Sequence, residues 1–161
     1  MIFFMGVDPG LNKTGVGVVE WNKGKLSYVG HTLISPASKM PLPDRLNTII
    51  EGVKKTSEQY CPHSAAVENV FYSVNAKSAL LLGQTRGAIL AALLFSQIPI
   101  CEFSALQIKQ SVVGYGKAEK GQVKKMVELH LCRSFDNVPF DVTDALACAI
   151  CLALHQTGRI C

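Results

Sequence analysis

Short apolar runs separated by turn residues fill the first 34 positions, which is the pattern of consecutive β-strands. Residues 2–7 are apolar or small and end at an Asp-Pro-Gly turn. Residues 14–21 and 26–34 are rich in β-branched and small side chains, with a turn at 22–25 between them. We therefore expect a three-stranded antiparallel meander at the start of the chain.

After residue 35, helical periodicity alternates with further short apolar runs. Asn75 and Ser104 each precede a helical segment and are candidate N-caps. The predicted elements are a helix around 46–53, a strand over 64–70, a helix from 76 to about 97, a strand over 99–103, a helix over 104–110, a basic loop over 114–121, and helices over 122–132 and 141–156. This order predicts one α/β domain over residues 1–161, built on a mixed sheet of five strands.

The composition is that of a folded protein with a mild preference for anionic partners. Hydrophobic residues make up 48% of the 161 positions and charged residues 17%, which excludes a disordered chain. The net charge of +4 leaves nucleic acids, phosphorylated metabolites and plain solubility open. The six cysteines are irregularly spaced and no secretory signal precedes them, so we expect a reduced, cytoplasmic protein. The longest apolar stretch, residues 87–101, is interrupted by polar residues and a proline, so we expect no membrane span.

Four acidic residues occupy positions where a folded core disfavours charge. Asp8 ends an apolar strand, Glu68 lies inside the fourth strand, and Asp141 and Asp144 lie three residues apart on one face of the last helix. Burying a carboxylate is unfavourable unless a cation or hydrogen bonds compensate for it. If the first and fourth strands are adjacent and the last helix crosses them, the four carboxylates converge. Oxygen ligands around one cavity select Mg²⁺ or Mn²⁺, and two such ions about 4 Å apart hold the attacking and leaving oxygens of a phosphoryl transfer.

The basic residues point to a partner rich in phosphate. Without those four acids the chain carries 16 basic and 8 acidic residues, a balance of +8. Six of the 16 lie between positions 109 and 133, namely Lys109, Lys117, Lys120, Lys124, Lys125 and Arg133. Such a cluster is typical of a phosphate-contacting surface, with a solvated helix face as the alternative.

Several of these candidates also have purely structural interpretations. Taken singly, Asp8 would only stabilise the Asp-Pro-Gly turn, and Asp141 would only cap the last helix. Cys148, Cys151 and His155 share one stripe of the last helix and imitate a metal site. A helical Cys-x-x-Cys lacks the loop geometry and second ligand pair of a zinc ribbon, so we interpret this stripe as core.

An ordered set of motifs resembles one known family over nearly the whole chain. The segments are Gly-Val-Asp-Pro-Gly at 6–10, Val-Glu-Asn-Val-Phe at 67–71, Ser-Ala-Leu at 78–80, Leu-Gly-Gln-Thr-Arg-Gly at 82–87, Gln-Ile-Lys-Gln-Ser-Val-Val-Gly at 107–114, Ala-Glu-Lys at 118–120, and Asp-Val-Thr-Asp-Ala-Leu-Ala at 141–147. In this order they resemble the RuvC family of bacterial Holliday-junction resolvases.

The resemblance implies an RNase H-like fold and a homodimer that nicks two like-polarity strands of a four-way DNA junction symmetrically. The residues that match the family's catalytic, metal-binding acids are Asp8, Glu68, Asp141 and Asp144. Lys109 and Lys120 match basic residues near the scissile phosphate, and Phe71 matches an aromatic that stacks on a base at the junction centre. From the basic cluster we add Lys117 and Lys124 as DNA contacts. The resemblance also implies RuvA and RuvB, which form a branch-migration complex, as partners.

The sequence thus favours a Mg²⁺-dependent endonuclease of recombination and repair, with two ions per subunit and Mn²⁺ as a substitute. Its products would carry 5′ phosphates and 3′ hydroxyls. One rival is a catalytically silent junction-binding module, which four phosphate-repelling carboxylates disfavour. Another is a lobe of a sugar-kinase or actin-like ATPase, which needs two lobes around a nucleotide where 161 residues supply one.

Overall fold

The computed structural model describes residues 1–69 and 75–158, so the predicted base-stacking residue Phe71 lies outside the described residues. The elements in chain order are β1 (Ile2–Asp8), β2 (Thr14–Asn22), β3 (Lys25–Ile34), α1 (Leu42–Tyr60), β4 (Ser64–Asn69), α2 (Ala76–Phe95), β5 (Ile100–Ser104), α3 (Ala105–Val113), α4 (Lys120–Leu131) and α5 (Phe140–Gln156). The strands are ordered β3-β2-β1-β4-β5. The first three strands pair antiparallel, whereas β4 pairs parallel with β1 and with β5, which confirms the predicted mixed sheet.

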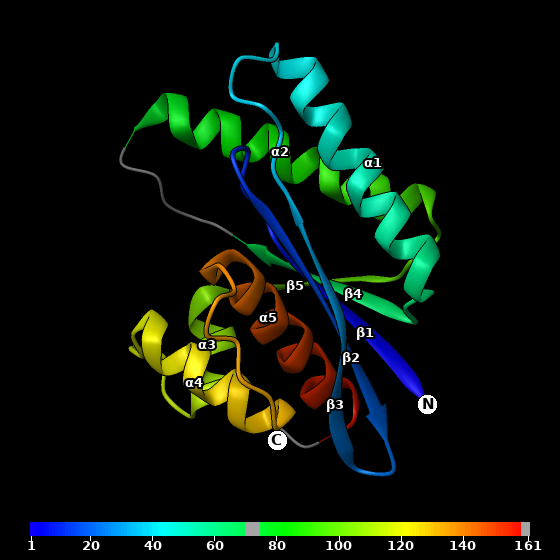
Figure 1. Cartoon of the computed structure of the whole chain (residues 1–161), viewed down its shortest axis with the longest axis vertical. Coiled ribbons are helices and arrows are strands. Elements are labelled where there is room, and N and C mark those ends of the chain that lie inside the picture. Colours follow the sequence, from blue (N-terminus) through cyan, green and yellow to red (C-terminus); the bar gives the residue numbers. More distant parts are fainter. Residues whose placement is uncertain (70–74, 159–161) are drawn as a thin grey trace.

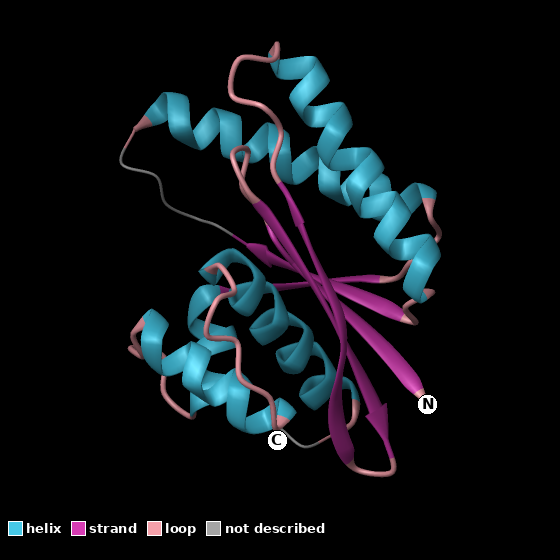
Figure 2. Cartoon of the chain, in the orientation of Figure 1, coloured by secondary structure: helices cyan, strands magenta, loops and turns pink. Residues whose placement is uncertain are grey.

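Helices cover both faces of this sheet, with α1 and α2 on one side and α3, α4 and α5 on the other (Figures 1 and 2). Val7 and Val67 are opposite each other in the β1–β4 pair and are buried in the core on the α1–α2 side. Since side chains alternate along a strand, the next residues, Asp8 and Glu68, point to the α5 side. Two acids thus reach the same face at neighbouring strand ends.

Two glycines let α5 approach the sheet closely enough to complete this arrangement. A Cβ on Gly6 would lie 2.1 Å from the carbonyl oxygen of Ala145, and one on Gly15 would lie 1.9 Å from that of Asp141. Neither distance is compatible with a side chain. Gly15 is also paired with Asp8 across β1 and β2, so the close contact brings the start of α5 next to the first acid.

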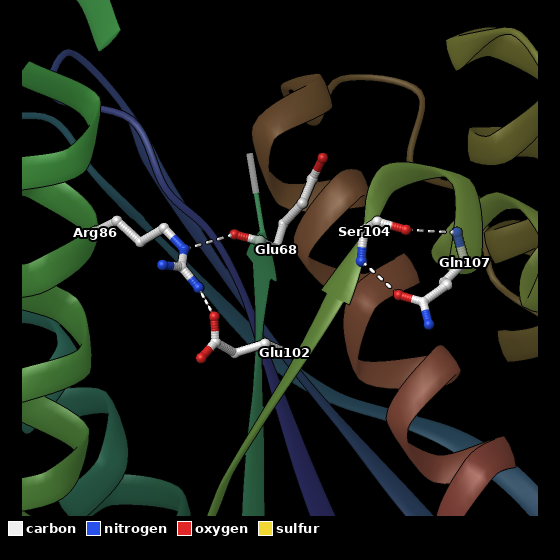
Figure 3. Close-up of polar contacts among 5 residues, drawn as sticks. All are labelled: Glu68, Arg86, Glu102, Ser104 and Gln107. Carbon is white, nitrogen blue, oxygen red and sulfur yellow. Dashed lines mark hydrogen bonds and ion pairs between the residues drawn. The ribbon is translucent and has the colours of Figure 1, made fainter. Parts of the chain in front are cut away.

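Asn75 and Ser104 cap their helices as predicted, whereas Asp141 lies inside the first turn of α5 and does not cap it. The Asn75 side chain accepts a hydrogen bond from the Lys77 amide, and Ser104 and Gln107 bond reciprocally at the start of α3 (Figure 3). A similar bond, from the Glu119 amide to Gln122 at 2.8 Å, starts α4 two residues earlier than predicted. Lys120 is therefore the first residue of a helix, not part of a loop.

The helix α2 is largely apolar over its whole length, including the part before the apolar stretch at 87–101. By length and composition alone, Ala76–Phe95 qualifies as a possible membrane span, with a mean hydropathy of 1.5. Only 22% of that window is buried against the rest of the described chain. This leaves much of an apolar helix without a covering surface.

Candidate active site

Three of the four predicted acids converge on one open pocket of about 190 Å³ at the carboxyl ends of β1 and β4. Its lining residues are Asp8, Glu68, Ala105, Ile108, Lys109, Lys120, Val123, Asp144 and Ala147. Two of the predicted DNA-contacting lysines therefore share the pocket with the acids. Five elements contribute to the lining, which explains why no local sequence motif contains the whole site.

Each acidic side chain reaches the pocket from a different part of the fold. Asp8 ends β1, Glu68 lies near the end of β4, and Asp144 extends from the second turn of α5. Asp141 is not among the lining residues but lies in the first turn of the same helix. Its charge still acts on the pocket, since it contributes to raising the pKa of both Asp8 and Asp144.

The carboxyl groups of the pocket are partly buried and close to one another, which disfavours their charged forms. Burial, with the nearby charges of Glu68, Asp144 and Asp141, raises the pKa of Asp8 to about 8. Burial is also the main cause of the raised pKa values of Glu68 and Asp144. Asp8 thus holds a proton at neutral pH in the metal-free protein.

Lys120 supplies a positive charge at the rim of this pocket. Its Nζ lies 3.1 Å from Oδ2 of Asp144, and this hydrogen bond raises the pKa of the lysine. The lysine side chain is 70% exposed and that of Asp144 17% exposed, so the ammonium is both anchored and open to solvent. It is available to a phosphate group that enters from outside.

The donor set of the pocket fits Mg²⁺. The described residues that line it include three carboxylates but neither Cys nor His, and hard oxygen donors favour Mg²⁺ over zinc. Within residues 1–69 and 75–158, no three His, Cys, Asp or Glu side chains are spaced to hold an ion as they stand. Because like charges repel when no cation lies between them, we expect the carboxylates to move closer together when a metal ion binds.

The two other lysines predicted to contact DNA, Lys117 and Lys124, are not among the residues that line the pocket. Lys117 is exposed in the loop between α3 and α4. The Nζ of Lys124 lies 6.0 Å from the ring centroid of Phe140, the residue that precedes Asp141 in the chain. Arg133, a member of the basic cluster that was not assigned a DNA contact, stacks on Tyr28 with its Cζ 4.4 Å from the ring centroid.

The two cysteines of the α5 stripe are core, as predicted, whereas His155 of the same stripe is exposed. Cys148 and Cys151 are both buried, and burial raises the pKa of Cys148 well above its usual value. Cys151 hydrogen-bonds to Ser111 at 3.3 Å, and the His155 ring stacks on Phe103 with centroids 4.9 Å apart. These contacts pack α5 against its neighbours.

The shifted pKa of Asp8 predicts how stability depends on pH in the presence of a chelator. The pKa rises from the ordinary aspartate value of 3.8 to about 8 in the fold, so the native state binds the extra proton between these limits. The parent should therefore lose stability relative to Asp8→Asn as pH rises from about 4 to about 8, by a few kcal/mol at ~1.4 kcal/mol per pKa unit. Thermal unfolding of both proteins from pH 4 to 9 measures this. Parallel profiles would show that Asp8 titrates normally.

The sequence reasoning missed one residue that supports the site. Arg86 of α2 donates a hydrogen bond from Nε to the carbonyl oxygen of Glu68 at 3.2 Å and forms an ion pair with Glu102 (Figure 3). The available signals were its place in the motif at 82–87 and its being the only arginine of a mostly apolar helix, but neither indicates which carbonyl group it contacts.

Sequence comparisons with known proteins give one consistent family for this chain. The sequence profile of the family described as crossover junction endodeoxyribonuclease RuvC matches residues 4–152. The chain is 48% identical over 159 residues to the crossover junction endodeoxyribonuclease RuvC of Nitrosomonas eutropha, covering 99% of this chain and 88% of the relative. It is 46% identical over 154 residues to the Polynucleobacter asymbioticus protein of the same name, covering 95% and 89%.

A solved structure gives the same result for the fold. Thermus thermophilus RuvC in complex with a Holliday junction substrate superposes with a TM-score of 0.91 at 27% identity, covering 99% of this chain and 97% of the other. The predicted RNase H-like fold is thereby confirmed. With a profile match over most of its length and relatives close to half identical, the chain belongs to the RuvC family of crossover junction endodeoxyribonucleases.

Proposed function

We propose that the protein is a structure-selective endodeoxyribonuclease that resolves Holliday junctions by paired nicking, in recombination and DNA repair. The observation that carries this proposal is the convergence of three carboxylates from three elements on a pocket whose other charged lining residues are lysines. A chain of the RuvC family with this pocket has the groups needed to hold divalent metal and to receive a phosphodiester.

The acids Asp8, Glu68, Asp141 and Asp144 are the proposed metal ligands, with two Mg²⁺ ions per subunit and Mn²⁺ as a substitute. Bound Mg²⁺ would supply Lewis-acid activation of water and charge neutralisation at the scissile phosphate. The protein's own part is to hold the carboxylates at adjacent strand ends and on the facing helix. Asp8 must also release the proton that its raised pKa retains.

The lysines position the DNA backbone. Lys109 and Lys120 line the pocket from α3 and α4 and are proposed to contact the scissile phosphate and its neighbours. Lys117 and Lys124 lie outside it and are proposed to contact phosphates further along the strand. Base stacking by Phe71 stays a prediction from the family resemblance.

Replacing Lys120 with Ala should weaken junction binding and reduce its salt dependence. A lysine on a phosphate releases about one counterion, so the slope of log K against log salt should shrink by roughly 0.9. Fluorescence anisotropy at several salt concentrations, in chelator, measures the slope. Lys54→Ala on the opposite face of the sheet is the matched control and should leave it unchanged. An unchanged slope for Lys120→Ala would exclude a backbone contact.

The exposed face of α2 supports a homodimer. Leu80, Gly83, Gly87, Leu90 and Leu94 are spaced three and four residues apart, which places them along one seam of the helix. Leu80 and Leu94 are each 65% exposed, and a Cβ on either glycine would meet nothing within 4 Å. Small residues between leucines allow two copies of the helix to pack closely. A two-fold pair would offer two pockets to a four-way junction at once.

The cellular context follows from this activity. We propose that the protein acts on DNA in the cytoplasm, together with RuvA and RuvB, which move the branch point. We propose both as partners on the basis of the family resemblance.

The direct test incubates the protein with a synthetic four-way junction and with a linear duplex of the same sequence. The proposal predicts nicks in the junction with Mg²⁺, none with chelator, and little or no cutting of the duplex. Tight junction binding without nicking under any metal would instead favour a silent binding module.

A further inference from the structure

Arg86 supports the active site from the opposite side of the sheet. It lies on α2, which covers the face remote from the pocket, and its side chain is only 18% exposed. Figure 3 shows the guanidinium between the main chain of Glu68 and the carboxylate of Glu102, whereas the Glu68 carboxylate extends away from it. Arg86 therefore contacts the backbone of a proposed metal ligand without being among the residues that line the pocket.

The two contacts of Arg86 fix both its own position and that of the strand end. Its Nη2 forms an ion pair with Oε2 of Glu102, which is paired with Val67 across β4 and β5. Its Nε donates to the carbonyl oxygen of Glu68 at 3.2 Å. A guanidinium can make both contacts at once because its donors form a rigid planar fork, which a lysine lacks.

Glu68 needs such support because of where it lies in the sheet. The β1–β4 pairing ends at Val7 and Val67, so Glu68 is one residue beyond it. On the other side it is paired with Phe103, one residue before the described β4–β5 pairing ends. A ligand at a strand end has fewer ladder bonds to fix its main chain than one in the middle.

We propose that Arg86 is a positioning residue of the nuclease site, holding the main chain of Glu68 so that its carboxylate meets the metal. The inference rests on the proposed function, because Glu68 must be a ligand for its placement to matter. Arg86 also precedes Gly87 of the exposed α2 seam, so one helix carries both the proposed dimer contact and the support of the site. Packing at the dimer interface would thus hold α2 in place, and α2 in turn holds the main chain of Glu68 through Arg86.

The test separates positioning from simple attachment of α2 to the sheet. The variants are Arg86→Met, which removes both contacts, Arg86→Lys, which keeps the charge without the fork, and Glu102→Gln, which removes the ion pair alone. Ile89→Val, one turn along and fully buried, is the control for lost packing on the same helix. Each is measured for thermal stability, for junction cleavage against Mg²⁺ concentration at saturating protein, and for Mn²⁺ binding by electron paramagnetic resonance without DNA.

Loss of a group that orients a metal ligand typically costs about 10- to 100-fold in metal affinity or activity. Arg86→Met should therefore weaken Mn²⁺ binding and lower the cleavage rate about tenfold or more, with junction affinity unchanged and the Mg²⁺ midpoint raised. Arg86→Lys should recover only part of this loss, and Glu102→Gln should stay within about threefold of the parent, since Nε still reaches Glu68. Ile89→Val should lower stability alone.

The contrary results are equally definite. Parental Mn²⁺ affinity and Mg²⁺ midpoint in a folded Arg86→Met protein would overturn the proposal, as would full recovery by Arg86→Lys. If the parent itself fails to cut junctions while binding Mn²⁺ through Glu68, the proposed function fails and the positioning role is judged on the metal-binding measurement alone.

Discussion

Glu68→Gln is expected to retain junction binding and to lose cleavage by about 100-fold or more. The glutamine has nearly the same shape but lacks the charge that a divalent ion requires, and metal-dependent stabilisation is realised mainly in the transition state. Removing one half-buried carboxylate also reduces the repulsion of DNA phosphates, so affinity should be equal or slightly higher. Single-turnover cleavage at saturating protein measures the rate, and gel shift in chelator measures the affinity.

Glu102→Gln is the matched control for this change. It makes the same substitution one strand away, on the face of the sheet remote from the pocket, and should leave the rate within about threefold. Residual cleavage by Glu68→Gln within tenfold of the parent would contradict the role of Glu68 as a metal ligand.

Mixing the parent with an excess of Asp8→Asn protein should change the product formed on a supercoiled cruciform plasmid. In the proposed dimer, a parent homodimer would cut both strands and give linear DNA, whereas a heterodimer would have one working pocket and give nicked circles. Nicking relaxes the plasmid and removes the cruciform, so the second cut cannot follow from a new binding event. Agarose gels read the ratio of nicked to linear product.

This experiment depends on subunit exchange, so proteins mixed before and after a brief unfolding and refolding step are compared. A matched mixture with Lys54→Ala, which leaves the pocket intact, should give linear product throughout. If linear DNA persists in proportion to parent protein after refolding with excess Asp8→Asn, two sites do not act within one dimer.

The sequence was sufficient to predict the sheet. Apolar runs and turn residues defined the strands, and the convergence of the acids was predicted on the condition that the first and fourth strands are adjacent and that the last helix crosses them. What the pattern could not supply was the distance between α5 and the sheet. That distance depends on Gly6 and Gly15, whose missing side chains accommodate the backbone of the helix.

The remaining differences come from contacts that join distant segments or side chains to main chain. Lys120 was expected in a flexible loop, but a bond between Glu119 and Gln122 extends the helix to include it. Arg86 lies 18 positions after the carbonyl group that it contacts, and no periodicity reports such a pair.

Mapping the cuts on a four-way junction tests the account most directly. Each of the four strands is labelled in turn at its 5′ end, the junction is incubated with the protein and Mg²⁺, and the product lengths are read at single-nucleotide resolution. The account predicts cuts at symmetric positions in two strands of like polarity, no cuts in chelator or with Glu68→Gln, and nicks that DNA ligase seals without further treatment. Cuts in a single strand, cuts scattered equally over duplex arms, or ends that ligase cannot join would contradict it.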